Sequence, residues 1–324
     1  MVEAAFVTGG SGFIGGRLVE RLLGEGRPVR ALARSDSSAE RVAAIGAEPV
    51  RGDIVDRASL ASAAAGADVA FHLAAHLGEW GPWADFERGN VEGTRNVLAA
   101  CAEAGVRRFV HCGTEAALMA GEPLVQVDET APLQPDSRAP YPATKARAEQ
   151  KVRDANRDGF ETVVVRPRFV WGKGDTTLLP GMVEAVEAGK WAWIGGGGNV
   201  TDTAHVDNVV EGLVLAAEKG GPGEAYFVTD GERVTFREFV TAMLETQGVE
   251  PPDRSLPAWA AAPMARVCEA AWKHLPLKGD PPMTAFRSWL LTQECTINIT
   301  KARTELDYKP IVTHEQGLAE LSLT

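Results

Sequence analysis

The N-terminal segment TGGSGFIGG constrains the fold more than any other part of the sequence. It directly follows the apolar run AAFVT at 4–8 and leads into a helical pattern at 12–25. Its glycines at 9, 12 and 15 have the spacing GxxGxxG. Glycines permit a tight turn, and they let backbone N–H groups at a helix N-terminus approach an anion. The segment therefore predicts a strand, a turn and a helix that together bind the phosphates of a dinucleotide, through Gly9, Gly12, Phe13, Ile14 and Gly15.

Apolar runs and helical patterns alternate through the first half of the chain. Further strands are predicted at 28–33, 47–51, 69–73, 108–112 and 162–166, and helices at 37–45, 57–65, 84–104 and 142–158. Ser37 and Glu40 have the spacing of a capping box for the second helix. The alternation predicts an α/β fold with a doubly wound parallel sheet of the Rossmann type.

The rhythm changes near residue 170, where helices, glycine turns and proline-rich linkers replace it. We therefore expect residues 1–168 to form a dinucleotide-binding domain, to which segments near 203–230 return. Residues 169–324 are expected to form a smaller, mostly helical substrate-binding portion. The connection at 113–140 is predicted to be a functional loop because of its length.

Charge and cysteine usage exclude several classes of function. The 324 residues carry a net charge of -11, and no cluster of Lys and Arg reverses it, which argues against a nucleic-acid surface. The four cysteines lie far apart without a CxxC pair, so neither a metal site nor a disulfide framework is expected. Charges and a proline interrupt the apolar segment 256–277, which predicts either a packed helix or an amphipathic cover over an apolar pocket. A cytoplasmic protein without a membrane span is the expectation.

The end of the second predicted strand bears on the identity of the dinucleotide. Arg34 and Ser35 stand where sites for NAD usually place an acid that holds the ribose 2′-hydroxyl. A cation and a hydroxyl suit a 2′-phosphate, so NADP(H) is the preferred cofactor. Asp36 is close enough to keep NAD(H) open, and Arg34 could instead begin a solvated loop.

Further cofactor contacts are predicted after the third and fourth strands. Asp53 and Ile54 stand where an adenine edge and face could be held, although Asp53 could equally cap the next helix. Small and apolar residues after the fourth strand would let the backbone approach the cofactor ribose, or could simply pack tightly: Leu73, Ala74 and Ala75.

The segment PYPATK places Tyr141 and Lys145 one helical turn apart. A phenol has an ordinary pKa of about 10, and an ammonium group on the same helix face would lower it toward neutral pH. Pro140 and Pro142 would fix the first helical turn. Thr114, after the fifth strand, offers a hydroxyl that could orient a substrate oxygen. The alternatives are an interface tyrosine, a solvated lysine and a capping threonine.

Aromatic residues indicate an apolar or aromatic-rich substrate pocket. His76, Trp80 and Trp83 lie beyond the carboxyl end of the fourth strand, where open α/β sheets bind ligands. Trp171 begins the second portion, and Glu115 adjoins Thr114. Each tryptophan could instead be a core or dimer contact.

The motifs TGGSGFIG, Gly52-Asp53, YPATK and VRPRFVWG, together with Thr114, resemble the extended short-chain dehydrogenase/reductase (NAD-dependent epimerase/dehydratase) superfamily. The chain looks closest to members similar to 3β-hydroxysteroid dehydrogenases, over nearly its whole length. The resemblance implies that Tyr141 is the acid/base, Lys145 its partner and Thr114 a ligand of the substrate oxygen. It also implies that Pro167 and Val170 lie near the nicotinamide, and that the chain forms a homodimer through the helices predicted at 84–104 and 142–158.

Two departures from the family pattern narrow the reaction. Dehydratases of nucleotide sugars place two acids after the threonine, but here Ala116 follows Glu115. Steroid dehydrogenases commonly carry an acid where this chain has Arg34. We therefore expect an NADP(H)-dependent oxidoreductase that interconverts an alcohol and a ketone or aldehyde on a largely apolar small molecule, with sterols among the candidates. The alternative is a nucleotide-sugar epimerase that retains its NAD(P), and a cofactor sensor without turnover is disfavoured because Tyr141 and Lys145 are both present.

Overall fold

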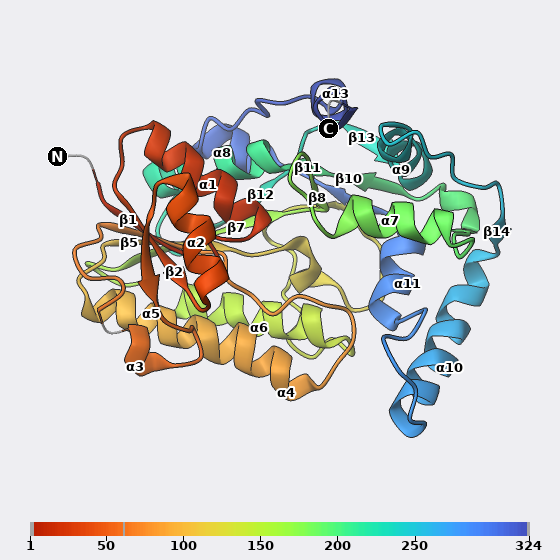
Figure 1. Ribbon diagram of the computed structural model, residues 1–324, viewed down its shortest axis with the longest axis horizontal. Helices are drawn as coiled ribbons and strands as arrows, with labels where there is room; N and C mark the ends of the chain where they lie inside the picture. Colours follow the sequence, from red (N-terminus) through yellow and green to blue (C-terminus); the bar gives the residue numbers. More distant parts are fainter. Residues whose placement is uncertain (1–2, 61, 323–324) are drawn as a thin grey trace.

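A computed structural model describes residues 3–60 and 62–322. Its main layer is a seven-stranded sheet in which every neighbouring pair is parallel (Figure 1). In spatial order the strands are β12 (Ala225–Val228), β7 (Glu161–Pro167), β5 (Arg108–Cys112), β4 (Val69–His72), β1 (Ala5–Thr8), β2 (Val29–Ala33) and β3 (Glu48–Arg51). This order confirms the doubly wound Rossmann sheet.

Helices cover both faces of this sheet, which explains why its central strands are apolar throughout. Figure 1 shows α1 (Phe13–Gly24), α2 (Asp36–Ile45) and α8 (Val206–Lys219) on one side. The opposite side carries α3 (Arg57–Leu60), α5 (Gly93–Glu103) and α6 (Pro140–Asp154). The six predicted strands all form, with bounds that differ from the predicted ones by about one residue.

The predicted capping box of α2 is wrong, because the helix begins earlier than expected. Ser35 is the N-cap: its side chain accepts a hydrogen bond from the backbone N–H of Ser38, and the Ser38 side chain accepts one from the backbone N–H of Ser35. Helix α3 ends at Leu60, short of the predicted 57–65, and residue 61 lies outside the described residues.

The helix predicted at 84–104 forms, but in three consecutive pieces. It begins as α4 (Trp83–Phe86), continues as the π-helical segment η1 (Glu87–Glu92) and ends as α5. A π segment inserts one extra residue per turn and so changes which side chains face the sheet. Helix α6 was predicted at 142–158, but it begins two residues earlier, at Pro140, and ends at Asp154. Pro140 suits the first helical position because a proline has no N–H to leave unsatisfied there.

The connection at 113–140 is more ordered than a loop. It contains the 3-10 turn η2 (Glu115–Leu118) and the strand β6 (Leu124–Val127). Strand β6 pairs with β15 (Cys295–Ile297) in a second sheet, which also contains β10 (Val200–Asp202) and β13 (Arg233–Thr235). This partner is about 170 residues away in the sequence, so local patterns do not reveal it.

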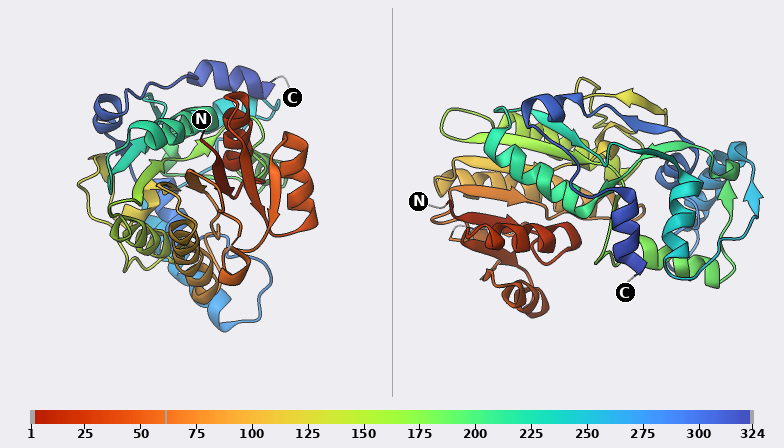
Figure 2. Two further views of the ribbon diagram at one scale, coloured as in Figure 1. Left: turned by 90° about the vertical axis from the view of Figure 1, so that its left-hand side faces the viewer. Right: turned by 90° about the horizontal axis from the view of Figure 1, so that it is seen from above.

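The remaining elements gather at the end of the molecule where the strands of the main sheet have their carboxyl ends (Figures 1 and 2). They include the short strands β8 (Val170–Trp171), β9 (Trp193–Ile194), β11 (Ala204–His205) and β14 (Ser255–Leu256). Their helices are α7 (Leu178–Glu187), α9 (Phe236–Glu245), α10 (Ala261–His274), α11 (Ala285–Thr292) and α13 (His314–Ser322). Helix α12 (Thr300–Glu305) lies apart from them against β12, where Lys301 pairs with Glu224. None of the helices in the described residues has the length and apolar character needed to cross a membrane.

Candidate active site

A cavity of about 860 Å³ lies where the loops after β1, β2, β3 and β4 meet. Most of the predicted cofactor residues line it, and so does one residue predicted to contact substrate. From these predictions it brings together Gly9, Gly12, Arg34, Ser35, Asp53, Ile54, Leu73, Ala74, Ala75 and His76. The carboxyl edge of a doubly wound sheet is where dinucleotides bind, so the position and the lining agree.

Two glycines of the first loop leave no room for a side chain. Gly9 has φ +76°, and a Cβ there would lie 2.8 Å from the backbone nitrogen of Ala74. A Cβ on Gly15 would lie 2.0 Å from the carbonyl oxygen of Gly9, so Gly15 packs α1 against the loop and does not line the cavity. Phe13 and Ile14 form the first turn of α1, and Ile14 packs on the core. The backbone cradle therefore fits a phosphate group.

The cavity wall beside β2 carries more polar groups than the sequence predicted. Ser38 and Arg41 line the cavity together with Arg34 and Ser35. The spacing of three residues from Ser35 to Ser38 to Arg41 keeps them on one face of α2, and this regular spacing is the signal that could have found Arg41. Asp36 does not line the cavity, and its exposed carboxylate lies 3.3 Å from Arg51.

Asp53 and Ile54 occupy the cavity wall beside β3. The Asp53 carboxylate accepts a hydrogen bond from the backbone of Val55, so it shapes its own turn. The alternative role for Asp53, capping the next helix, belongs to Asp56, which accepts from the backbone of Ala58. Ile54 lies against Gly93 of α5, where a Cβ would approach the isoleucine to 2.7 Å.

The predicted catalytic side chains Tyr141, Lys145 and Thr114 meet at the carboxyl end of β5. Helix α6 carries Tyr141, which is half-buried, and Lys145, which is buried. The Lys145 ammonium donates to the carbonyl of Cys112, the last residue of β5, at 2.9 Å. Thr114 follows two residues later, and its hydroxyl is near enough to the Tyr141 phenol to influence the pKa of that phenol. The same hydroxyl accepts a hydrogen bond from the backbone N–H of Ala116, so Thr114 also caps the 3-10 turn η2, which was the alternative role predicted for it.

The electrostatic surroundings keep the phenol protonated. Burial raises the pKa of Tyr141 well above its ordinary value, and the negative charge of Glu115 and the Cys112 thiol raise it further. The nearby Thr114 hydroxyl lowers the pKa of Tyr141 and so acts in the opposite direction. Burial lowers the pKa of Lys145. The expected effect of Lys145 on the phenol is not found here, since the lysine is not among the groups that shift the pKa of Tyr141.

Glu115, predicted to contact substrate, is occupied by two protein partners. One carboxylate oxygen accepts from Arg168 at 2.5 Å, and the other accepts from the Thr114 hydroxyl at 2.8 Å. Both Glu115 and Arg168 are almost fully buried, and Arg168 also donates to Thr201. A buried pair of this kind is costly to break from one side, because the remaining charge loses its partner. Glu115 therefore orients Thr114 and does not face a substrate directly.

Asn90 links the cofactor cavity to helix α6, and no local sequence pattern predicted this role. Its side-chain amide makes hydrogen bonds of 2.7 and 3.1 Å to the backbone N–H and carbonyl of His76. The same amide donates to Thr144, the residue before Lys145. Asn90 is buried within the π segment η1, whose irregular turn is not visible in apolar periodicity.

A second cavity, of about 530 Å³, lies among α7, α9, α10 and α11. Its lining is mostly apolar and includes Phe169, Leu178, Met182, Trp191, Trp193, Phe236, Met264, Met283, Leu290 and Leu291. The Tyr141 ring packs 5.8 Å from the ring of Phe286, on the same helix as Leu290. Glu79, from the loop after β4, makes a 2.7 Å ion pair with Arg287 at this cavity. Helix α11 therefore connects Tyr141 to the apolar cavity.

The tryptophans predicted to contact substrate lie elsewhere. Trp171 is fully buried and donates its indole N–H to Asp230 at 2.9 Å, so it belongs to the core of the second portion. Trp80 is half-buried and Trp83 is 44% exposed at the start of α4, and neither lines the two cavities. Trp191 and Trp193 line the apolar cavity.

The two residues that the resemblance placed near the nicotinamide, Pro167 and Val170, lie close to the end of β5. Pro167 is the buried last residue of β7, which pairs directly with β5. Val170 lies in β8 and packs on the main core while remaining partly exposed. Both are therefore at the same edge of the sheet as Thr114.

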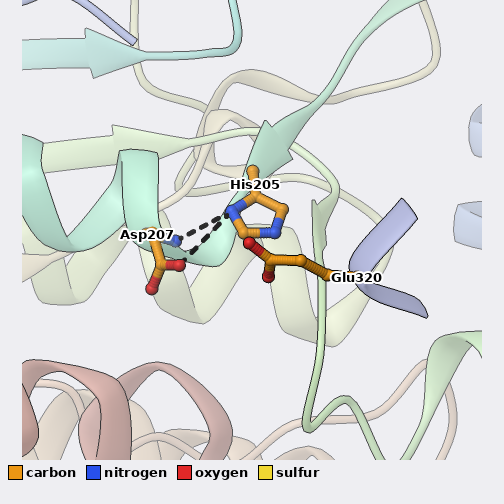
Figure 3. Close-up of side chains that lie close together, drawn as sticks. All are labelled: His205, Asp207 and Glu320. Carbon is orange, nitrogen blue, oxygen red and sulfur yellow. Dashed lines mark hydrogen bonds and ion pairs between the residues drawn. The ribbon is translucent and has the colours of Figure 1, made fainter. Parts of the chain in front are cut away.

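One cluster in the described residues has spacings suitable for a metal ion. His205, Asp207 and Glu320 place their ligand atoms within 4.8 Å of one another (Figure 3). Arg17 already binds both carboxylate oxygens of Asp207, at 3.0 and 2.7 Å. The backbone N–H of Asp207 donates to the imidazole of His205. These partners make the cluster an ionic contact among α1, α8 and α13, and the geometry does not favour a cation.

Comparison with known proteins identifies the family. Residues 6–258 match the profile of the 3-beta hydroxysteroid dehydrogenase/isomerase family. A 4-hydroxy-2-methyl-3-oxo-4-farnesyl-3,4-dihydroquinoline-1-oxide ketoreductase from Stigmatella aurantiaca is 48% identical over 98% of this chain and 95% of its own length. A 2-alkyl-3-oxoalkanoate reductase from Stenotrophomonas maltophilia is 37% identical over 97% of both chains.

Solved structures agree with these relatives. The crystal structure of gox2253 superposes with a TM-score of 0.79 at 30% identity, covering 99% of this chain and 98% of that one. A UDP-glucose 4-epimerase from Thermotoga maritima has a TM-score of 0.76 at 23% identity, covering 99% and 97%, and shares the fold. The chain therefore belongs to the 3-beta hydroxysteroid dehydrogenase/isomerase family, within the extended short-chain dehydrogenases/reductases, and is an oxidoreductase of the type that uses a nicotinamide cofactor.

Proposed function

We propose that the protein is an NADP(H)-dependent ketoreductase that interconverts a ketone and an alcohol on an apolar small molecule. The observation that carries this proposal is the position of Tyr141. Its phenol contacts Thr114 and lies beside the Lys145 helix turn, while its ring packs on Phe286, whose helix lines the apolar cavity. The Tyr141 phenol, as the proposed reacting group, therefore lies next to the apolar cavity.

The preference for NADP(H) rests on the wall of the cofactor cavity beside β2. Arg34 and Arg41 offer two guanidinium groups there, and Ser35 offers a hydroxyl. Guanidinium groups bind phosphate oxygens through paired hydrogen bonds. Asp36, the acid that would favour a free 2′-hydroxyl, is turned toward Arg51. A ribose 2′-phosphate is the group that this wall fits.

The chemistry of the chain is proton transfer and orientation, and bound NADPH supplies the hydride that reaches the carbonyl carbon. Tyr141 donates to the carbonyl oxygen, and Thr114 joins it by turning its one hydroxyl proton from the Glu115 carboxylate to that oxygen. As negative charge develops on that oxygen, Tyr141 donates its phenolic proton to it. Lys145 is held by the Cys112 carbonyl, and it stabilises the remaining phenolate only if its ammonium turns from that carbonyl toward the phenol. Because burial and Glu115 raise the pKa of Tyr141, the phenol is protonated at neutral pH, which is the form that reduction requires.

The substrate is inferred from the apolar cavity and from the relatives. Both relatives named above are reductases of oxo compounds, one with a farnesyl group and the other with an alkyl group. A volume of about 530 Å³ with an aliphatic and aromatic lining suits such a chain. The buried indole N–H groups of Trp191 and Trp193 have no protein partner among the described residues and are available to an acceptor on the ligand. We infer a ketone that carries a long alkyl or prenyl chain.

A nucleotide-sugar epimerase is the second candidate, and one observation favours it. Lys190 and Arg254 line the apolar cavity and are exposed, so they could hold a diphosphate. A carbonyl panel distinguishes the two reactions: a 2-alkyl-3-oxoalkanoate, a prenylated quinolone ketone, a 3-ketosteroid and UDP-glucose. We expect net NADPH consumption with an apolar ketone. Conversion of UDP-glucose without net NADPH consumption would contradict the ketoreductase.

A further inference from the structure

Helix α10 and its flanking turns expose apolar side chains that play no part in the active site described above. Trp259 is 78% exposed, Val267 69%, Leu275 56% and Leu277 44%. No other stretch of similar length in the described residues exposes as many large apolar side chains. Exposure of this kind in one place indicates an interaction surface. We call residues 259–278 the α10 surface.

The exposed side chains of the helix lie on one face. Pro263, Arg266, Val267, Ala270 and His274 are exposed, and their spacing of three or four residues places them along the same side. The opposite side packs into the protein through Ala261, Met264, Ala265 and Cys268. Figure 1 shows α10 projecting from the body of the molecule beside α11. The outward face is therefore presented to whatever lies beyond this end of the protein.

The α10 surface is cationic although the protein as a whole is acidic. Three of the Lys and Arg residues lie between 259 and 278, and Glu269 is the only acid in that range. The carboxylate of Glu269 is directed inward, where it accepts from the backbone of Ala285 at 2.6 Å. The whole chain, by contrast, has a net charge of -11. Cations among exposed tryptophan and leucine complement an anionic surface with an apolar interior.

The same segment forms part of the apolar cavity wall. Leu256 precedes the α10 surface, Met264 lies within it, and Met283 follows it, and all three line the cavity. The exposed side and the cavity-facing side of this segment are thus separated only by the thickness of one helix, about 10 Å. A molecule held at the α10 surface is close to the chamber.

We infer that the α10 surface docks on the anionic surface of a lipid bilayer. Trp259, Val267 and Leu275 enter the headgroup region, where tryptophan and aliphatic side chains are stable. Arg266, Lys273 and Lys278 keep their charges at the lipid phosphates while their aliphatic stems cover apolar surface. Docking does not depend on the proposed reaction. Only the route of an apolar substrate from the bilayer into the cavity rests on the proposed function.

Co-sedimentation with vesicles tests docking without using the enzyme's activity. The full chain is mixed with vesicles of phosphatidylglycerol and phosphatidylcholine in equal parts, or of phosphatidylcholine alone, at low and high salt. We expect binding to the anionic vesicles, weakened by salt and absent with phosphatidylcholine alone. Protein that remains in the supernatant with both vesicle types would overturn the inference.

Two sets of variants separate the charged and apolar parts of the surface. The set Arg266→Glu, Lys273→Glu and Lys278→Glu is expected to lower the vesicle partition coefficient by on the order of 100-fold or more, at about 1 kcal/mol for each cation lost. The set Trp259→Ser, Val267→Ser and Leu275→Ser is expected to lower it about tenfold or more. Binding by both sets at the wild-type level would overturn the inference.

The control combines two exposed apolar residues from other elements. Val125→Ser and Ile311→Ser replace side chains that are 56% and 50% exposed, so this variant is expected to bind vesicles like the wild type. Size-exclusion chromatography with light scattering tests the competing occupant, a second copy of the chain. A wild-type dimer that the Trp259, Val267 and Leu275 set converts to a monomer would show that this face pairs with another subunit, and would overturn docking on lipid.

Discussion

The two cavities of the molecule are built in opposite ways. The cofactor cavity is formed by backbone and short side chains from consecutive strand–loop–helix units, as with Gly9, Gly12 and Ala74. The apolar cavity is formed by large side chains from segments scattered between residues 79 and 291. Backbone geometry leaves motifs in a sequence, whereas side-chain packing between distant segments does not. The first cavity could therefore be predicted from local sequence patterns, whereas the second could not.

The largest expected effect concerns Tyr141, which lies between the two cavities. Tyr141→Phe removes the phenolic proton and keeps the ring that packs on Phe286. We expect kcat for an apolar ketone to fall by about 10³-fold, within the range for general acid catalysis. NADPH affinity, measured by fluorescence titration, should stay within about twofold. Full turnover by the variant would show that another group supplies the proton.

The next largest effect is expected from substitutions that alter only the cofactor cavity. Arg34→Ala together with Arg41→Ala removes both guanidinium groups near the proposed 2′-phosphate. The ratio of kcat/KM with NADPH to that with NADH should fall by about 100-fold, because each charge-assisted hydrogen bond contributes about 1.5–3 kcal/mol. Arg51→Ala is the matched control, since Arg51 pairs with Asp36 outside the cavity. An unchanged ratio in the double variant would mean that the 2′-phosphate is not bound there.

A smaller effect confines the change to the apolar cavity. Leu178→Ala removes one aliphatic side chain from its wall. We expect kcat/KM for a long-chain ketone to fall by about tenfold, while a short-chain ketone and NADPH affinity are little affected. Val125→Ala, at an exposed position away from both cavities, is the control. Equal losses for long and short ketones would place the substrate chain elsewhere.

The smallest expected effect is a shift of the pH profile. The Glu115 carboxylate raises the pKa of Tyr141, so Glu115→Gln should lower that pKa. Reduction needs the protonated phenol, and activity is therefore lost as the pH rises through the pKa of Tyr141. The alkaline limb of kcat should accordingly move to lower pH in the variant. The thermal unfolding of the variant is measured before the pH profile, because Arg168 loses its ionic partner. A folded variant whose alkaline limb does not move would contradict this role for Glu115.

The sequence predicted the parts of the site that depend on local backbone geometry. The strand before Gly9, the glycine spacing and the proline start of α6 are each restricted to a few residues, and all three are found as expected. The position of Arg34 at the cofactor cavity follows from the same regularity, because it stands at the end of β2.

Packing between distant segments explains what the sequence did not predict. Trp171 and Trp193 are both tryptophans in short strands, but only the tertiary fold buries the first against Asp230 and places the second at the cavity. The ion pair of Glu115 with Arg168 joins residues 53 positions apart. Asn90 depends on a π segment, which leaves no mark in apolar periodicity.

Isotope labelling tests most directly whether the protein reduces an apolar ketone by hydride transfer from NADPH. The protein is incubated with NADPH deuterated at C4 and a long-chain ketone, and the alcohol is analysed by mass spectrometry. The account predicts one deuterium on the carbinol carbon for each NADPH consumed, and a loss of this product in Tyr141→Phe despite bound NADPH. An alcohol without deuterium, or a nucleotide sugar epimerised while NADPH is unchanged, would contradict it.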